Sequence, residues 1–313
     1  MRVLISGLNG FAGSHLARKL VKEGHDVHGT MRVRSDLHRI ADIKDQVTLH
    51  LVELSDYLSV KGVMDLVKPD QVYHLAAQSY VKSSWDAPTE TYQTSTIGTV
   101  NVLEAARTME KIPEILVVST SEIYGDNDGM SDENTTPNPN THYGIAKYTQ
   151  DLMARMYHKA YHMPIVVTRA FNITGDGRSD AFADSSFAKQ IAEIEKGKKE
   201  PVILHGNLDT ERVFVDVEDA VNGYVLAMDS KRWGEVFCFG NDHPVRIKDL
   251  LDTLISLSVV KVETKVDPSR FRPIDTRTMK CDATKAREVL GWKQTVPFED
   301  SMKNLLNYWR NRT

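Results

Sequence analysis

Two groups of side chains in this sequence have the types and spacing that acid–base chemistry needs. Tyr143 and Lys147 are four residues apart, and Thr120 and Glu122 follow the apolar run 115–119. Residues four apart on a helix share a face, so we expect the phenol and the ammonium to lie together. A tyrosine with its reference pKa of about 10 is a poor base at neutral pH, and a neighbouring ammonium lowers that pKa. The set therefore predicts proton transfer with a substrate hydroxyl or carbonyl, which Thr120 would hold beside Tyr143.

A glycine series near the N-terminus predicts where a dinucleotide binds. Gly7, Gly10 and Gly13 follow the apolar run 2–6 and open an amphipathic segment. The first glycine permits a tight turn, the second lets the backbone approach phosphate, and the third lets the helix lie close to the strand. The helix N-terminus then offers N–H groups to the pyrophosphate. Because a strand precedes the series and a helix follows it, we favour this interpretation over a plain strand-to-helix turn.

The end of the second predicted strand bears on which nicotinamide cofactor is bound. An acidic residue there accepts the ribose 2′-hydroxyl and favours NAD. This chain has Arg32, Arg34 and Ser35 instead, and two guanidiniums and a hydroxyl suit a 2′-phosphate. We predict NADP(H) rather than NAD(H), the alternative being that the arginines are surface charges or subunit contacts. The predicted cofactor-binding residues are Gly7, Asn9, Gly10, Phe11, Gly13, Arg32, Arg34, Ser35, Glu53, Leu54, Leu75, Ala76, Ala77, Tyr143 and Lys147.

Strand-like and helical segments alternate over the first half of the chain. The expected strands are 3–6, 26–31, 47–53, 71–75, 115–119 and 165–169, and the expected helices are 11–23, 58–67, 91–109 and 142–161. Strands separated by helices pair in parallel, so the fold class is α/β, with a doubly wound parallel (Rossmann) sheet. After about residue 171 short strands, expected at 201–204 and 212–215, mix with helices. We predict a dinucleotide-binding domain with the catalytic residues at 1–171 and a smaller mixed α/β substrate-binding lobe at 172–313, the chain crossing back to the first domain around 213–240.

The composition argues against several classes of protein. The 313 residues suffice for a full core, and a net charge of -4 does not suggest binding to nucleic acid or an anionic membrane. Cys238 and Cys281 are too few for a disulfide framework, and His158 and His162 lack a third ligand, so we expect no metal. No apolar stretch approaches the roughly 20 residues of a membrane span. The first strand leaves no room for a signal peptide, so we expect a cytoplasmic protein.

Taken together, these motifs resemble the extended short-chain dehydrogenase/reductases that modify nucleotide sugars, the epimerase/dehydratase family. The family's Tyr-x-x-x-Lys falls on Tyr143 and Lys147, and its upstream Ser/Thr falls on Thr120. Within the family the chain is most similar to the GDP-mannose 4,6-dehydratases and the GDP-4-keto-6-deoxy-D-mannose reductases, over nearly its whole length. The resemblance implies a GDP-linked sugar nucleotide as substrate, and a homodimer or homotetramer.

Glu122 is the residue that favours a dehydratase. The dehydratases carry Ser-Thr-Ser-Glu-x-Tyr-Gly, and residues 119–125 match this stretch. The resemblance implies oxidation at C4 with Tyr143 as base, followed by removal of the C5 proton by Glu122. Water then leaves C6 and the hydride returns there. The alternative is that Glu122 is a loop carboxylate or binds sugar hydroxyls.

Other segments favour a reductase. The tracts 186–195 and 81–85 are similar to 4-keto sugar reductases, whereas 32–46 and 74–79 are similar to the dehydratases. The dehydratases' usual Asn-His-Glu-Ser is absent, because residues 173–177 read Ile-Thr-Gly-Asp-Gly. A GDP-mannose-type 4,6-dehydratase is therefore the leading hypothesis. An NADPH-dependent reductase, a nucleotide-sugar epimerase and a non-catalytic NADP-binding regulator are the alternatives.

A sugar nucleotide carries a negatively charged pyrophosphate, so cations are expected in the second lobe. Their positions in segments that resemble the family suggest which residues these are. The predicted substrate-binding residues are Ser79, Asn172, Lys189, Arg212 and Arg272. Each of the three cations has the alternative reading of a solvated surface charge.

Overall fold

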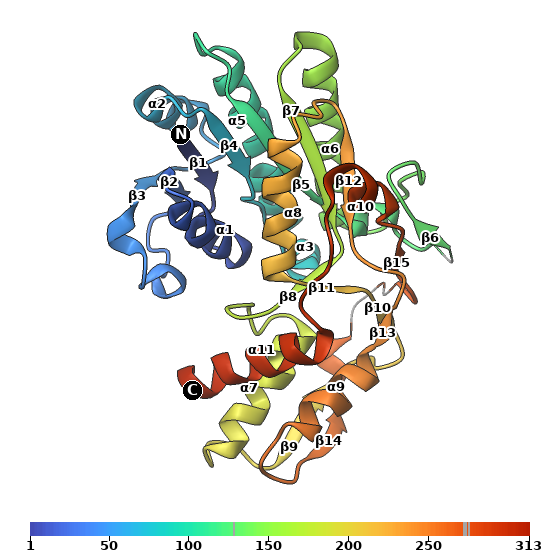
Figure 1. Cartoon of the computed structure of the whole chain (residues 1–313). Helices are drawn as coiled ribbons and strands as arrows, with labels where there is room; N and C mark the ends of the chain where they lie inside the picture. The colour runs from blue at the N-terminus through green and yellow to red at the C-terminus, as the bar shows by residue number, and fades with distance from the viewer. Residues whose placement is uncertain (128, 272–273, 275) are drawn as a thin grey trace.

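The computed structural model describes residues 1–127, 129–271, 274 and 276–313 (Figure 1). Its centre is a seven-stranded sheet in the order β12-β7-β5-β4-β1-β2-β3, with every neighbouring pair parallel. The strands are β1 (Arg2–Ser6), β2 (Asp26–Met31), β3 (Val47–Leu51), β4 (Gln71–His74), β5 (Glu114–Thr120), β7 (Ile165–Ala170) and β12 (Val236–Phe239). The order reverses between β1 and β4, the point where such sheets bind ligands. The predicted doubly wound Rossmann sheet is confirmed.

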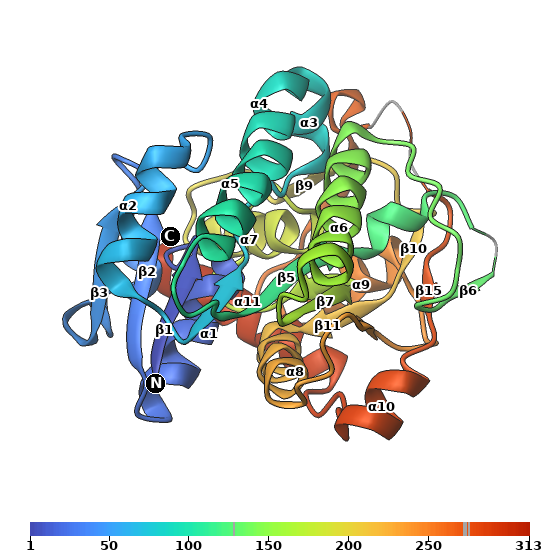
Figure 2. The same ribbon diagram turned by 90° about the horizontal axis from the view of Figure 1, so that it is seen from above.

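Helices cover both faces of the sheet (Figure 2). One face carries α1 (Phe11–Lys22) and α8 (Val217–Asp229), and the other carries α2 (Tyr57–Val67), α5 (Gly98–Arg107) and α6 (His142–Tyr161). The strands are apolar on both sides for this reason: Val3 and Ile5 enter one core, whereas Leu4 between them enters the other.

The second lobe lies below the sheet in Figure 1. Helices α7 (Ala183–Glu195), α9 (Ile247–Ser256) and α11 (Phe298–Arg312) pack around their own apolar cluster, which includes Phe187, Leu250 and Leu305. Short strand pairs complete it: β8 (Asn172–Thr174) with β11 (Phe214–Asp216), β9 (Val202–His205) with β14 (Glu263–Val266), and β10 (Glu211–Arg212) with β13 (Val245–Arg246). Between these segments α8 and β12 return to the sheet.

Smaller elements connect the layers. They are η1 (His38–Ile40), η2 (Lys44–Gln46), α3 (Val81–Asp86), α4 (Pro88–Tyr92), η4 (Ser121–Tyr124), β6 (Met130–Ser131) paired with β15 (Lys280–Cys281), η5 (Pro268–Arg270) and α10 (Thr284–Leu290). No helix in the described part of the chain is long and apolar enough to cross a membrane.

The structure corrects two predicted elements. The single helix expected over 91–109 is divided, because α4 is followed by a π-helical turn at Gln93–Ile97 before α5 begins. The strand expected over 212–215 is also divided, since Glu211–Arg212 pairs with β13 whereas Phe214–Asp216 pairs with β8. In both cases the tertiary partners, and not the local sequence, set the break.

Candidate active site

A cleft of about 1060 Å³ opens at the carboxyl ends of the strands, between the sheet and the second lobe. Its walls are the loop after β1, the ends of β2, β4 and β5, the loop after β8 and the start of α7. Pockets for single small molecules usually measure roughly 300–1,000 Å³. The cleft is therefore large enough for a long ligand or for two ligands side by side.

All four predicted catalytic residues line this cleft. Thr120 ends β5, Glu122 lies in η4, and Tyr143 and Lys147 lie in the first turns of α6. The start of α6 is fixed by Thr141, whose hydroxyl accepts a hydrogen bond from the third residue of the helix. The structure thus brings together the two groups that lie far apart in the sequence.

Gly144 lets α6 approach the loop that carries Glu122. A Cβ at this position would lie 2.7 Å from the carbonyl oxygen of Glu122 and 3.1 Å from Cβ of Pro139. Any side chain here would push helix and loop apart. This glycine, next to Tyr143 in the sequence, explains how the phenol and the carboxylate come to face one cleft.

Tyr143 is not the acidic phenol that the sequence predicts. Burial, together with the negative charge of Glu122, raises the pKa of Tyr143 to about 12, although a hydrogen bond with Thr120 and the positive charge of Arg178 act in the opposite direction. The prediction that Lys147 makes this phenol acidic is wrong for the protein by itself. The physical reason is that Nζ of Lys147 donates to the carbonyl oxygen of Val118 on β5, at 2.5 Å.

Lys147 is itself strongly perturbed. The residue is 3% exposed, and burial lowers the pKa of its ammonium to about 7, while the charge of Asp151 raises it. The imidazole of His74 on β4 is a second titratable group near Lys147. Burial and the charge of Lys147 lower the pKa of His74 to about 3, so it is neutral. Lys147 can therefore gain or lose a proton near neutral pH.

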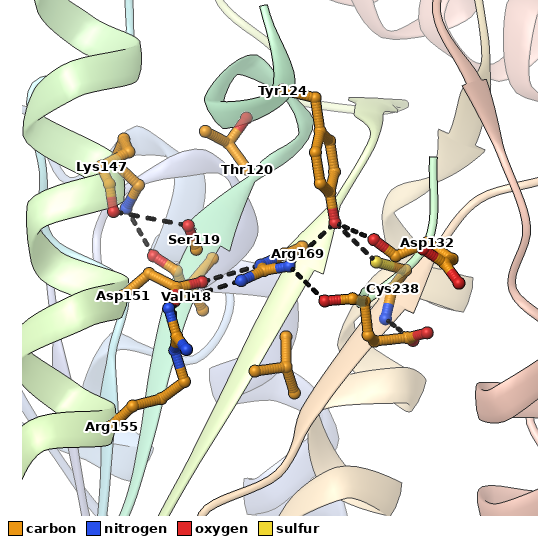
Figure 3. Close-up of polar contacts among 12 residues, drawn as sticks. Val118, Ser119, Thr120, Tyr124, Asp132, Lys147, Asp151, Arg155, Arg169 and Cys238 are labelled. Carbon is orange, nitrogen blue, oxygen red and sulfur yellow. Dashed lines mark hydrogen bonds and ion pairs between the residues drawn. The ribbon is translucent and has the colours of Figure 1, made fainter. Parts of the chain in front are cut away.

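A buried ionic network behind Lys147 ties α6 to the sheet (Figure 3). Asp151, one turn further along α6, accepts hydrogen bonds from Nε of Arg169 at 2.8 Å and from Nε of Arg155 at 2.7 Å. Arg169 on β7 also donates, at 3.0 Å, to the hydroxyl of Tyr124, and Tyr124 is the last residue of η4. The side chains of Arg169 and Asp151 are 2% and 0% exposed. The network thus holds both the helix of Lys147 and the loop that carries the carboxylate.

The glycine loop has the backbone that a dinucleotide pyrophosphate needs. Gly7 has a φ of 73°, in the left-handed region. A Cβ at Gly13 would lie 2.3 Å from the carbonyl oxygen of Gly7, so only glycine allows α1 to start this close to the loop. No side chain caps α1 after Gly10, and no acidic residue lies in its first turn. This bare N-terminus at the edge of the cleft fits an anionic group.

The residues predicted to bind the cofactor line the cleft, with one exception. Arg34 is exposed and, among the described residues, is not part of the lining. Arg32 and Ser35 are part of it, and Arg32 lies 3.7 Å from Glu90. Asp36 also lines this end, but its carboxylate accepts a hydrogen bond from the backbone N–H of His38 and contacts the ring of His38 at 2.6 Å.

The predicted substrate-binding residues divide into three groups. Ser79, Asn172 and Arg212 line the cleft. Lys189 does not belong to the lining that the structure describes, because its ammonium contacts Asp180 at 2.6 Å and lies 5.2 Å from the ring centre of Trp309. Arg272 lies outside the described residues.

Arg178 is a cation of the cleft that the sequence did not reveal. It is 7% exposed, forms an ion pair with Asp184 at 3.1 Å and lies 4.3 Å from the ring centre of Phe182. Its charge is one of the two influences that lower the pKa of Tyr143. A single arginine in the loop after β8 has no spacing signal, so only the folded chain shows its position.

Comparison with known proteins gives consistent results. The family model described as GDP-mannose 4,6 dehydratase matches residues 4–305. Human GDP-mannose 4,6 dehydratase is 30% identical, over 97% of this chain and 90% of that protein. GDP-6-deoxy-D-mannose reductase of Pseudomonas aeruginosa is 26% identical, over 99% and 98%.

Two solved structures show the same fold. UDP-glucose 4-epimerase of Thermotoga maritima, with UDP-glucose, superposes with a TM-score of 0.89 at 27% identity, over 100% of this chain and 99% of that chain. RMD from Pseudomonas aeruginosa, complexed with NADPH, superposes with a TM-score of 0.84 at 24% identity over the full length of both chains.

Proposed function

The chain belongs to the GDP-mannose 4,6-dehydratase family, and from this premise we propose that it is an NADP-dependent GDP-mannose-type 4,6-dehydratase. The observation that carries the proposal is the carboxylate of Glu122, which lines the same cleft as Tyr143 and acts on its pKa through charge. Hydride transfer alone needs only Thr120, Tyr143 and Lys147. A second proton acceptor in the cleft suits a reaction that also removes a proton from carbon.

The residues of the chain divide the steps between them. Tyr143 takes the proton of the C4 hydroxyl, which Thr120 holds by a hydrogen bond. Once C4 is a ketone, the C5 proton is acidic and Glu122 removes it, so that water can leave from C6. When bound, NADP would supply the hydride acceptor for C4 and the donor for C6, and the positive charge of its oxidised ring would favour the phenolate form of a nearby tyrosine. Lys147, which lines the cleft, would hold the nicotinamide ribose.

NADP is the cofactor that this end of the cleft favours. Arg32 and Ser35 line it, and a guanidinium binds a phosphate more strongly than it binds a ribose hydroxyl. The carboxylate of Asp36 at this end already contacts His38 and lies 3.6 Å from Arg312. The Pseudomonas structure that shares this fold holds NADPH.

A 4-keto sugar reductase is the second candidate. The chain covers 98% of the Pseudomonas aeruginosa reductase but 90% of the human dehydratase. A reductase uses the same Thr120, Tyr143 and Lys147, and in it Glu122 would bind a sugar hydroxyl. An epimerase is the third candidate, because the Thermotoga maritima epimerase is matched over 99% of its chain. A non-catalytic regulator lacks such a supporting observation.

We also propose that the protein is a homodimer, with a homotetramer as the larger alternative. Ile145, Leu152 and Met156 lie on one face of α6 and are 41%, 43% and 48% exposed, and Ile97 before α5 is 46% exposed. Neighbouring apolar side chains on two helices form a surface that a second copy could cover. The cytoplasmic location and the domain boundary at residue 171 stay predictions.

The variant Glu122→Gln tests the proposed function. Glutamine keeps the size and hydrogen bonding of the side chain but cannot take the C5 proton. With GDP-mannose and one equivalent of NADP in deuterated water, we expect reduced cofactor to form while the 4-keto-6-deoxy product falls roughly 10²-fold or more and C5 gains no deuterium.

Asp126→Asn is the matched control, because Asp126 is an exposed carboxylate two residues after the end of η4 and does not line the cleft. It should keep the turnover of the unmodified protein. Product formation by Glu122→Gln at the unmodified rate would remove Glu122 from the mechanism.

A further inference from the structure

Tyr224 brings a buried hydroxyl without a partner to the cleft. The residue lies on α8, is 0% exposed and belongs to the cleft lining. Its hydroxyl oxygen is buried and has no hydrogen-bond partner among the residues that the structure describes. A buried hydroxyl without a hydrogen-bond partner destabilises a fold, and phenylalanine would fill the same space without that cost. The hydroxyl therefore points to a partner that is not part of the chain.

The surroundings of Tyr224 hold its ring in place. The ring packs at a tilt on Phe239 of β12, with their centres 6.2 Å apart, and the ring of Trp292 also packs on Phe239, with their centres 5.1 Å apart. Helix α8 lies close to β12 at Gly223, because a Cβ at this position would lie 2.8 Å from the ring of Phe239. The position of the Tyr224 hydroxyl is therefore set before any ligand arrives.

Tyr224 approaches the cleft from the side opposite to Tyr143. Helix α8 packs on β5 and β7 from one face of the sheet and α6 packs on them from the other, as Figure 2 shows. The two phenols are nonetheless within electrostatic reach of each other, since burial and the neighbouring Tyr143 both raise the pKa of Tyr224. Tyr224 therefore lines the part of the cleft that also contains Tyr143.

We propose that the hydroxyl of Tyr224 is a binding group for the nicotinamide end of the cofactor, an inference that rests on the proposed NADP-dependent function. The carboxamide of a nicotinamide has both donors and an acceptor, and a phenol hydroxyl can serve either. Together, Tyr224 from α8 and Tyr143 from α6 would fix the ring from two sides. The residues that the sequence marked as cofactor-binding all come before residue 148, so this contact adds an element from the second half of the chain.

Tyr224→Phe tests the proposal because it removes the hydroxyl and nothing else. In the cofactor-free protein the melting temperature should stay the same or rise, since the lost group has no partner in the chain. Calorimetric titration with NADPH alone, without sugar nucleotide, should show an affinity about 5- to 10-fold weaker, as expected for one lost hydrogen bond.

Tyr157→Phe is the matched control with the opposite expected pattern. Tyr157 is 6% exposed and its hydroxyl donates to Glu104 at 2.6 Å, away from the cleft lining. This variant should melt at a lower temperature and bind NADPH as tightly as the unmodified protein.

Three outcomes would overturn the proposal. NADPH affinity unchanged in Tyr224→Phe, with weaker binding of GDP-mannose, would assign the hydroxyl to the sugar. Unchanged binding of both ligands would make Tyr224 a core residue only. A clear loss of thermal stability would show that the hydroxyl has a partner within the fold. The titration needs no turnover, so its result stands whether the enzyme is a dehydratase or a reductase, whereas failure of the unmodified protein to bind NADPH would refute the proposed function itself.

Discussion

Replacing Lys147 by methionine should stop the reaction and make the cofactor-free protein more stable. Lys147 is 3% exposed, and burial lowers the pKa of its ammonium from 10.5 to about 7. Such a depression means that the fold destabilises the charged form of this side chain. Methionine has a similar length and no charge, so the variant relieves that cost while it removes the ammonium that we propose holds the cofactor ribose.

The size of the effect follows from two opposing contributions. The lowered pKa corresponds to roughly 5 kcal/mol of charge burial, at about 1.4 kcal/mol for each tenfold change in proton affinity. The hydrogen bond from Nζ to the carbonyl oxygen of Val118 is lost in the variant, and a hydrogen bond from a charged group is worth about 1.5–3 kcal/mol. A net gain of about 2–3.5 kcal/mol remains. At about 2.1 cal/mol/K of unfolding entropy per residue, this raises the melting temperature of a 313-residue chain by about 3–5 °C.

The pH dependence gives the prediction a second, independent readout. Between about pH 7 and 10 an unfolded lysine keeps its proton while buried Lys147 has lost it. The unfolded state then binds more protons, so the stability of the unmodified protein relative to the variant rises with pH in this window. The advantage of Lys147→Met should therefore be largest near pH 7 and shrink towards pH 10.

Thermal unfolding at both pH values measures the effect, with Lys159→Met as control because Lys159 is an exposed lysine on the same helix. The control should melt with the unmodified protein. If Lys147→Met melted at or below the unmodified protein at pH 7, the ammonium would contribute net stability, and the reasoning from its burial would be refuted.

Two further predictions concern the rest of the site. Asp151→Asn should lower stability by about 3–5 kcal/mol, because it leaves Arg169 buried without its carboxylate. Arg155→Ala should cost about 1 kcal/mol or less, because the side chain of Arg155 is 37% exposed. Equal losses of stability in thermal unfolding would contradict this difference between the buried and the exposed partner of Asp151. Tyr143→Phe should lower turnover roughly 10²-fold or more with NADPH affinity nearly unchanged, and a steady-state rate close to that of the unmodified protein would exclude Tyr143 as the acid–base group.

The elements whose own sequence defines them were predicted well. The strand Asp26–Met31 and the helix His142–Tyr161 have the bounds that the sequence indicated, because apolar periodicity and a capping threonine mark them locally. The π-helical turn at Gln93–Ile97 carries no such mark. This turn ends next to Gly98, which packs so closely against Leu54 that an added Cβ on the glycine would lie 3.0 Å from Cβ of Leu54. A contact between segments so far apart in the chain leaves no periodic pattern in the sequence.

In the candidate site, too, the residues with a characteristic spacing were predicted, and those whose position depends on contacts between distant segments were not. The glycine loop and the Tyr143–Lys147 pair have characteristic spacings, and the cleft contains them. The direction of Lys147, which turns to Val118 and not to Tyr143, depends on β5 lying beneath α6. Lys189 matched the family in its segment, but Asp180 and Trp309 hold it in the fold.

The reaction of GDP-mannose with a catalytic amount of NADP distinguishes the proposed chemistry from its alternatives. The measurement is the sugar product, by mass and by its 4-keto group, together with the absorbance of reduced cofactor. We expect conversion of many equivalents of GDP-mannose to the 4-keto-6-deoxy sugar with no net change in the cofactor. GDP-mannose left unchanged, while NADPH is consumed stoichiometrically with the 4-keto-6-deoxy sugar as substrate, would show a reductase and contradict the role assigned to Glu122.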